Sequence, residues 1–230
     1  MRIELVDSDD WELRRFHGRE LADEDEDWNH WRVLDEGILV FGDDEVRRTQ
    51  GEPLLMRKVV EAHADIILAC ADRFAVSEQF LAALVATQSG GDERAEKLDE
   101  RAKDWGIGLA QMLTATARKT ARSRPQEFPT VAPEPVPAGG APEVWRGILR
   151  DPTTALALAA AWARDASARL DLRGDPLLLF CAYETGGLSE ADNAWGVAHH
   201  RQLEEGVVVS DSLDDFAASY GDACAVYGLC

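Results

Sequence analysis

The chain has 230 residues, of which 46% are hydrophobic and 29% charged, which fits one medium-sized domain or a domain with an appendage and excludes disorder throughout. It carries 24 Lys and Arg against 43 Asp and Glu, and the field of a formal net charge of -19 repels nucleic-acid phosphates and anionic membrane surfaces. No apolar run approaches the roughly 20 residues that cross a bilayer. We therefore expect no nucleic-acid partner and no membrane span.

The first 50 residues differ from the rest of the chain. They are rich in charge and tryptophan, contain the acidic run 23–27, and hold one short apolar stretch at 37–41. Such a segment covers a core rather than building one. We therefore predict a small irregular or β-containing N-terminal region at 1–50, followed by the main domain at 51–230.

Two helices are predicted next. The first begins at Pro53, and its apolar residues recur at the spacing of one helix face: Leu55, Val59, Ala62, Ile66 and Cys70. The second is capped by Ser77 and ends at the glycine pair 90–91. Its apolar stripe passes through Leu84 and continues into Gln88, so a polar side chain extends an inward face.

Loops and further helices alternate in the rest of the chain. A charged loop is predicted at 92–104, and a proline-rich surface excursion or linker at 125–142. Three further helices are predicted from apolar spacing, at 114–122, 152–170 and 176–183. A last helix begins at Ser212 with capping-box spacing and runs through Phe216, Tyr220 and Cys224. The whole is predicted to be a mainly α-helical protein.

The cysteines and histidines give little sign of a metal centre. Cys70, Cys181, Cys224 and Cys230 are widely spaced, with no CxxC pair, and buried thiols are the simpler interpretation. The pair 199–200 is the nearest approach to clustered histidines, but adjacent side chains point in different directions on any regular element. We expect no metal.

Four short motifs carry the chemistry of the chain. In order they are Gln88-Ser89-Gly90, Gly108-Leu109-Ala110-Gln111, Asp151-Pro152 and Ala182-Tyr183-Glu184-Thr185-Gly186. The series resembles that of goose-type lysozymes and soluble lytic transglycosylases, which are family 23 glycoside hydrolases of the lysozyme-like superfamily. The resemblance covers about residues 55–190 and implies a lysozyme-like α-helical fold that needs no cofactor.

Two departures from the family pattern carry weight. The family has its catalytic Glu where this chain has Gln88, and an Asn where it has Glu184. Cleaving a glycosidic bond requires protonation of the leaving oxygen, and a glutamine has no proton to give at neutral pH. The chain is therefore predicted to bind glycan and to turn it over poorly. Because the other motifs are intact, a Gln88 introduced into an active enzyme is favoured over a natural pseudoenzyme.

The resemblance also assigns roles to other residues, each with a simpler alternative. Ser89 could merely belong to a glycine-capped helix end, Gln111 could be a solvated loop amide rather than a substrate-binding one, and Tyr183 could be core. Glu184 is either a second catalyst or a surface carboxylate. Three aspartates of the charged loop are candidates for a carboxylate that positions water: Asp92, Asp99 and Asp104. Two loop tryptophans are candidates for stacking on sugar rings: Trp105 and Trp195.

These assignments predict a lytic transglycosylase or muramidase that cuts the β-1,4 bond between N-acetylmuramic acid and N-acetylglucosamine in peptidoglycan. The alternative is a glycan-binding or interaction protein in which Gln88 is native. The first ten residues lack the apolar core of a secretory signal. An enzyme made in the cytoplasm would then reach the cell envelope by injection or as a phage-type lysin. A basic immunity protein would complement its acidic charge.

Overall fold

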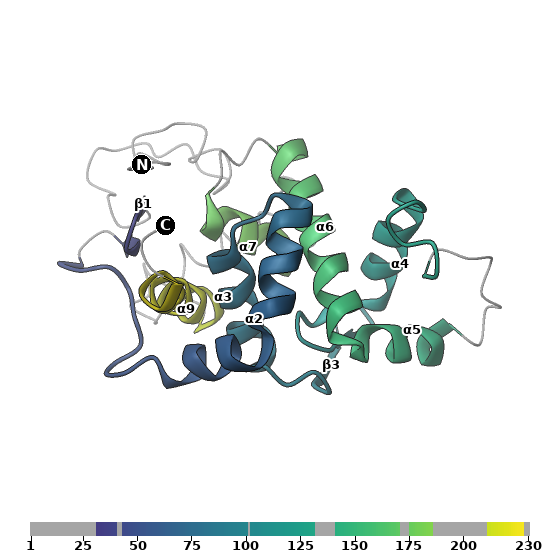
Figure 1. The fold of residues 1–230 in the computed structure, drawn as a ribbon, viewed down its shortest axis with the longest axis horizontal. Helices are drawn as coiled ribbons and strands as arrows, with labels where there is room; N and C mark the ends of the chain where they lie inside the picture. The colour runs from purple at the N-terminus through teal and green to yellow at the C-terminus, as the bar shows by residue number, and fades with distance from the viewer. Residues whose placement is uncertain are drawn as a thin grey trace. The chain divides into compact units, whose positions relative to one another are not determined.

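The computed structural model describes residues 31–40, 43–100, 102–131, 141–170, 175–185 and 211–227. These residues are mainly helical, with a small β region near the N-terminus, as the sequence predicted (Figure 1). The chain divides into two compact units: residues 57–165 form one, and residues 1–56 together with 166–230 form the other. The predicted boundary between residues 50 and 51 stays a prediction. No described helix is both long and apolar enough to cross a membrane.

The predicted helices are present. Their bounds are α2 (Leu54–Phe74), α3 (Glu78–Ser89), α4 (Thr114–Ser123), α6 (Pro152–Leu170), α7 (Pro176–Thr185) and α9 (Asp211–Tyr227). Ser77 caps α3, because its hydroxyl accepts a hydrogen bond from the Phe80 amide at 3.1 Å. The last helix already begins at Asp211, so Ser212 lies inside it and not at its cap.

Helix α3 is enclosed by the protein on every side. Each residue from Gln79 to Ala86 is buried, and all but Gln79 have apolar side chains. A helix that is apolar around its whole circumference needs neighbours on every face. Its first residue, Glu78, is half-exposed, and beyond Ala86 the helix becomes half-exposed again in its last turn, from Thr87 onward. The buried part of α3 therefore fixes where the Gln88-Ser89-Gly90 motif reaches the surface.

The buried face of α2 differs from the predicted one. Leu55 is 44% exposed and Ala62 is also exposed, although both were expected to face inward. The predicted inward positions Val59 and Cys70 are confirmed, and the other buried residues of the helix are Met56, His63, Ile67, Ala71 and Phe74. The prediction used apolar residues alone and therefore left out His63, which is polar but lies on the buried face.

The predicted charged loop at 92–104 is wrong at residues 96–99 and at residue 104, because these positions belong to a three-stranded antiparallel sheet. The order is β3 (Glu96–Asp99), β4 (Asp104–Ile107) and β5 (Met112–Leu113). Residues 99 and 104 face each other across the β3–β4 turn. The sequence Glu96-Lys97-Leu98-Asp99 has too few apolar residues to show the alternation of a strand, so its pairing with the more apolar β4 is what forms it.

Helix α5 (Ala141–Arg150) was not predicted and begins inside the supposed proline excursion. Pro142 lies in its first turn, where a proline is tolerated, and residues 132–140 lie outside the described residues. Figure 1 shows α5 beside α4 and next to the sheet. Gly108, at the end of β4, approaches α5 so closely that an added Cβ would lie 2.0 Å from the Leu149 carbonyl oxygen.

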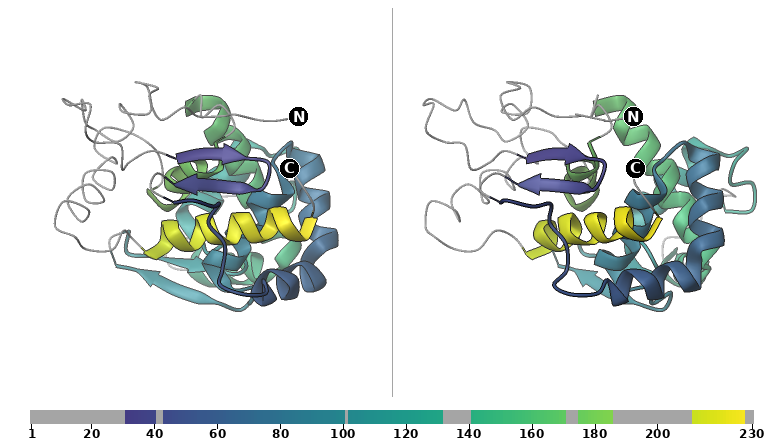
Figure 2. Two further views of the ribbon diagram at one scale, coloured as in Figure 1. Left: turned by 90° about the vertical axis from the view of Figure 1, so that its left-hand side faces the viewer. Right: turned by 60° about the vertical axis from the view of Figure 1, so that its left-hand side comes forward.

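The other unit combines two segments that are far apart in the sequence, residues 1–56 and 166–230. A hairpin of β1 (Trp31–Leu34) and β2 (Gly37–Val40) lies along α9, as Figure 2 shows. An added Cβ on Gly221 would lie 2.1 Å from the Arg47 carbonyl oxygen. Arg47 also forms an ion pair with Asp214 at 2.5 Å, and stacked rings of Phe180 and Phe216 join α7 to α9 at 4.2 Å. The predicted buried thiols Cys70, Cys181 and Cys224 are confirmed, whereas Cys230 lies outside the described residues.

We predict that Gly108→Ala destabilises the protein by at least about 2 kcal/mol, because a side chain there meets backbone and must adopt a positive φ. Gly147→Ala is the matched control, since nothing lies within 4 Å of a Cβ at that helical position. This second change should leave stability unchanged or raise it by about 0.5–1 kcal/mol. Urea unfolding of the two variants measures both, and equal stabilities would contradict the close approach at Gly108.

Candidate active site

The last turn of α3 brings Gln88 and Ser89 out of the core. Gly90 ends the helix with a left-handed φ of 61°, and its amide donates to the Ala86 carbonyl at 3.1 Å. The Ser89 hydroxyl donates to the Val85 carbonyl at 3.1 Å and accepts from the Gly91 amide at 3.2 Å. Ser89 therefore shapes the helix end on which Gln88 is held, in addition to the substrate contact predicted for it.

A short hydrogen-bonded path connects this helix end to the second motif. The Asp92 amide donates to the Ser89 carbonyl, and the Ala95 amide donates to the Asp92 carbonyl. The Gly108 amide then donates to the Ala95 carbonyl at 2.9 Å. The structure thus joins the first two sequence motifs within one compact unit.

The side chain of Gln111 is part of that connection. Its Nε2 donates to the carbonyl oxygens of Ala95 at 2.8 Å and Gly108 at 2.9 Å, and its backbone has a left-handed φ of 49°. With both amide protons given to the main chain, Gln111 offers a substrate its carbonyl oxygen and no donor. Because this amide is bonded to the main chain, the simpler interpretation of Gln111 as a solvated loop amide is wrong, and we expect a substitution at Gln111 to disturb the turn.

The candidate water-positioning aspartates make backbone contacts of their own. Asp104 accepts from the Trp105 and Ala115 amides, each at 2.8 Å, and from the Thr114 hydroxyl at 2.6 Å. It therefore caps the first turn of α4 from a neighbouring strand. Asp99 accepts from the Ala102 amide at 2.8 Å inside the β3–β4 turn. Asp92 is exposed and accepts from the Arg94 amide at 2.9 Å.

Trp105 lies on a partly apolar surface of the sheet. It pairs across the strands with Leu98, and the two side chains are 36% and 45% exposed. The Arg146 guanidinium of α5 lies 5.6 Å from the Trp105 ring centroid, and its Nε lies 3.2 Å from a Glu96 oxygen. One face of the indole is thus held by a cation, and the rest of its exposed surface is available for stacking.

The fourth motif belongs to the other compact unit. Tyr183 is half-buried near the end of α7, and Glu184 is exposed beside it. Burial raises the pKa of the Tyr183 hydroxyl, and the neighbouring Glu184 carboxylate raises it further. The role that the resemblance assigns to Tyr183 stays a prediction. Trp195 lies outside the described residues.

Sequence reasoning missed several residues around the helix end and the sheet: His63, Glu96, Leu98 and Arg146. His63 was detectable as the polar member of an otherwise apolar stripe of α2. The other three depend on pairing between β3, β4 and α5, which no local pattern shows. The described residues contain no cluster of three or more His, Cys, Asp or Glu that could hold a metal ion.

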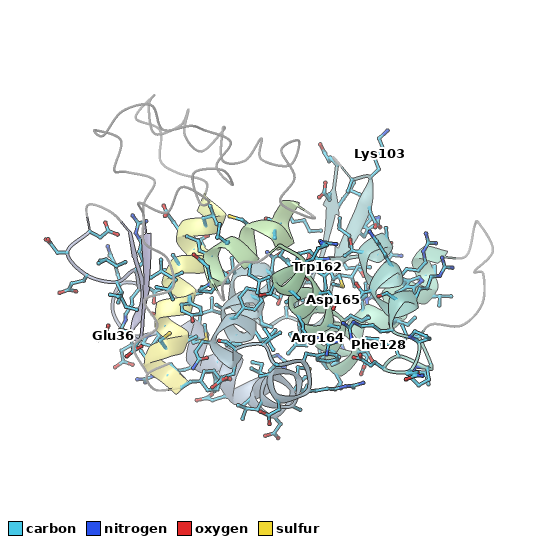
Figure 3. All side chains as sticks on the ribbon, turned by 90° about the horizontal axis from the view of Figure 1, so that it is seen from above. Glu36, Lys103, Phe128, Trp162, Arg164 and Asp165 are labelled. Carbon is cyan, nitrogen blue, oxygen red and sulfur yellow. The ribbon has the colours of Figure 1, made fainter. Side chains whose placement is uncertain are left out.

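A separate charged cluster lies at the ends of α2 and α4, where Figure 3 labels Phe128, Arg164 and Asp165. Arg124 forms ion pairs with Glu127 and Asp165, and hydrogen bonding to Asp165 is the main cause that raises the pKa of Arg124. Arg164 lies 5.4 Å from the Phe74 ring centroid. The charged groups of this cluster are paired with one another, so we interpret the cluster as structural.

Comparison with known proteins gives no independent assignment. No protein-family model matches the chain, and no curated protein matches it.

We predict that Asp104→Ala lowers the free energy of unfolding by about 1–2 kcal/mol, because α4 loses its cap. Asp99→Ala is the matched control and should cost less, since Asp99 supports a single amide in an exposed turn. Chemical denaturation of the two variants measures the difference. If Asp104→Ala proves as stable as Asp99→Ala, the capping role is wrong.

Proposed function

We propose that the chain is a lysozyme-like, peptidoglycan-cleaving glycosidase in which Gln88 occupies the place of the proton donor. The bond cut is the β-1,4 bond between N-acetylmuramic acid and N-acetylglucosamine. The observation that carries the proposal is the position of residue 88 on the first half-exposed turn of a helix that is otherwise enclosed. That turn is hydrogen-bonded onward to the sheet and to the second sequence motif.

This position suits an acid that must keep its proton. A glutamate at residue 88 would be partly desolvated beside the apolar end of α3. It would also lie at a helix C-terminus, where the partial negative charge of the last carbonyls opposes ionisation. Both effects favour the neutral carboxylic acid, which can protonate a leaving glycosidic oxygen near neutral pH. Glutamine at this site hydrogen-bonds the same oxygen but transfers no proton.

The bonding of the loop aspartates favours a reaction with a single carboxyl group. Asp104 already accepts three hydrogen bonds and Asp99 is tied into a turn, so neither is well prepared to activate water. In the single-carboxyl reaction the acid protonates the oxygen of the leaving sugar and the bond to the muramic C1 breaks. The resulting carboxylate removes the proton of the muramic 6-hydroxyl, whose oxygen bonds to C1 and gives a 1,6-anhydro product.

The surface of Leu98 and Trp105 supports a sugar-binding role for the same unit. An exposed indole packs well against the apolar face of a pyranose. The acidic chain as a whole, with its net charge of -19, suits a basic protein as inhibitor. The site of action that follows from this substrate is the bacterial cell envelope.

We predict that Gln88→Glu releases soluble muropeptides from purified peptidoglycan at least about a hundredfold faster than the present chain, because the substitution restores a transferable proton. Gln88→Asp is the control: it supplies a carboxyl group that is one methylene shorter and should remain close to the present chain. Mass spectrometry identifies the product, and 1,6-anhydro ends are expected. Reducing ends would instead indicate hydrolysis and return Asp92 to consideration as the second carboxylate.

The same experiment tests the alternative function. A chain that binds peptidoglycan in pull-down, but whose Gln88→Glu form releases nothing, would be a glycan-binding module with a native glutamine. Failure of both binding and release would contradict the proposed substrate altogether.

Cell lysis tests the substrate in vivo. Gln88→Glu directed to the periplasm of a Gram-negative host should lyse the cells, and the same chain retained in the cytoplasm should not, because peptidoglycan is outside the inner membrane. Optical density and release of a cytoplasmic marker are the measurements. Equal toxicity in both compartments would point to a different target.

A further inference from the structure

The side chain of His63 reaches the segment that leaves α3. His63 lies on the inward stripe of α2 and is 9% exposed. Its Nε2 is 3.0 Å from the carbonyl oxygen of Gly91. Since that oxygen can only accept, Nε2 carries the hydrogen and the imidazole is the donor. The bond is made three residues beyond Gln88.

Gly91 fits closely against α2 at this point. It has a positive φ of 83°, and an added Cβ would lie 3.2 Å from Val59 Cγ2 and 3.8 Å from His63 Nε2. Val59 and His63 are one helical turn apart, so a single patch of α2 contacts the glycine. The contact combines packing from Val59 with a directional hydrogen bond from His63.

Other hydrogen bonds of this turn come from its own backbone and from Ser89. The Gly90 amide bonds to Ala86, the Gly91 amide to Ser89 Oγ, and the Asp92 amide to the Ser89 carbonyl. All of these span a few residues of the same segment and would move with it. The hydrogen bond of His63 instead joins the segment to a different helix, α2. His63 and Gly91 are 28 residues apart in the sequence.

We propose that His63 is a positioning residue, which holds the end of α3 through Gly91 so that the side chain at residue 88 meets the glycosidic oxygen in a fixed place. The inference rests on the proposed function, because it assigns His63 to the geometry of that reaction. The histidine itself exchanges no proton with the substrate in this role. Misplacing a catalytic group by about 1 Å can cost roughly a hundredfold in rate, so a remote hydrogen bond of this kind can control turnover.

Two variants separate the hydrogen bond from the packing. His63→Phe keeps an aromatic ring of similar size but has no donor, whereas His63→Gln places an amide N–H near the position of Nε2. Both are made in the Gln88→Glu chain, with Asp65→Asn, an exposed change on the same helix, as control. His63→Phe should lower kcat for muropeptide release about tenfold or more with KM changed less than about twofold. His63→Gln should recover most of the loss, and Asp65→Asn should match its parent.

A second measurement tests the hydrogen bond between His63 and Gly91 independently of enzymatic activity. Amide hydrogen exchange of residues 88–92 in the present chain should speed up in His63→Phe and return toward its original rate in His63→Gln. If Gln88→Glu is active but His63→Phe keeps its kcat, the positioning role is wrong while the proposed function stands. If Gln88→Glu is inactive, the proposed function and the catalytic role of His63 both fail. The exchange rates then test only whether His63 anchors the turn. Unchanged rates in His63→Phe would show that it does not.

Discussion

Complete enclosure of α3 is the constraint on which the rest of the structure depends. A helix with buried residues on every face cannot rotate or slide without burying polar groups or opening voids in a close-packed interior. Its N-terminus is fixed by the Ser77 cap and its C-terminus by Gly90 and Gly91. The side chain at residue 88 therefore inherits its position from apolar packing on residues that take no part in chemistry. Under the proposed function, this rigid support is what holds the side chain of the active-site acid in place.

Much of the helical architecture could be predicted from sequence because the signals are local. The Ser77 cap, the glycines after Ser89 and the apolar period of α6 each depend on residues a few positions apart. The buried face of α2 was harder, since His63 and Ala71 contribute to it and apolar spacing alone selects Leu55 instead. A polar residue can belong to a core when its hydrogen bond is made elsewhere in the fold, and such a bond leaves no trace in hydropathy.

The sheet and α5 could not be predicted for a different reason. Glu96 and Lys97 take strand conformation because Ile107 and Gly106 lie opposite them, and two arginines of α5 neutralise Glu96. Gln111 and Asp104 looked like free polar groups in sequence, but their hydrogen bonds go to main-chain atoms brought near by folding. The first three motifs lie in one unit and the fourth in the other, and the contacts of individual polar side chains depend on tertiary structure.

The packing of residues 31–49 against α9 has a consequence for biosynthesis. Residues 57–165 are continuous, so that unit is complete as soon as residue 165 has left the ribosome. The segment that carries the β1–β2 hairpin has no such option, because Arg47 and Thr49, which follow the hairpin, bind Asp214 and Asp222 of α9, 167 and 173 residues later in the chain. Gly37 approaches Gly221 just as closely, with an added Cβ only 2.9 Å from the Gly221 Cα. The β1–β2 hairpin is therefore synthesised well before the helix that it packs against, and during that interval Val33 and Ile38, which are buried in the finished protein, remain exposed to chaperones and to aggregation.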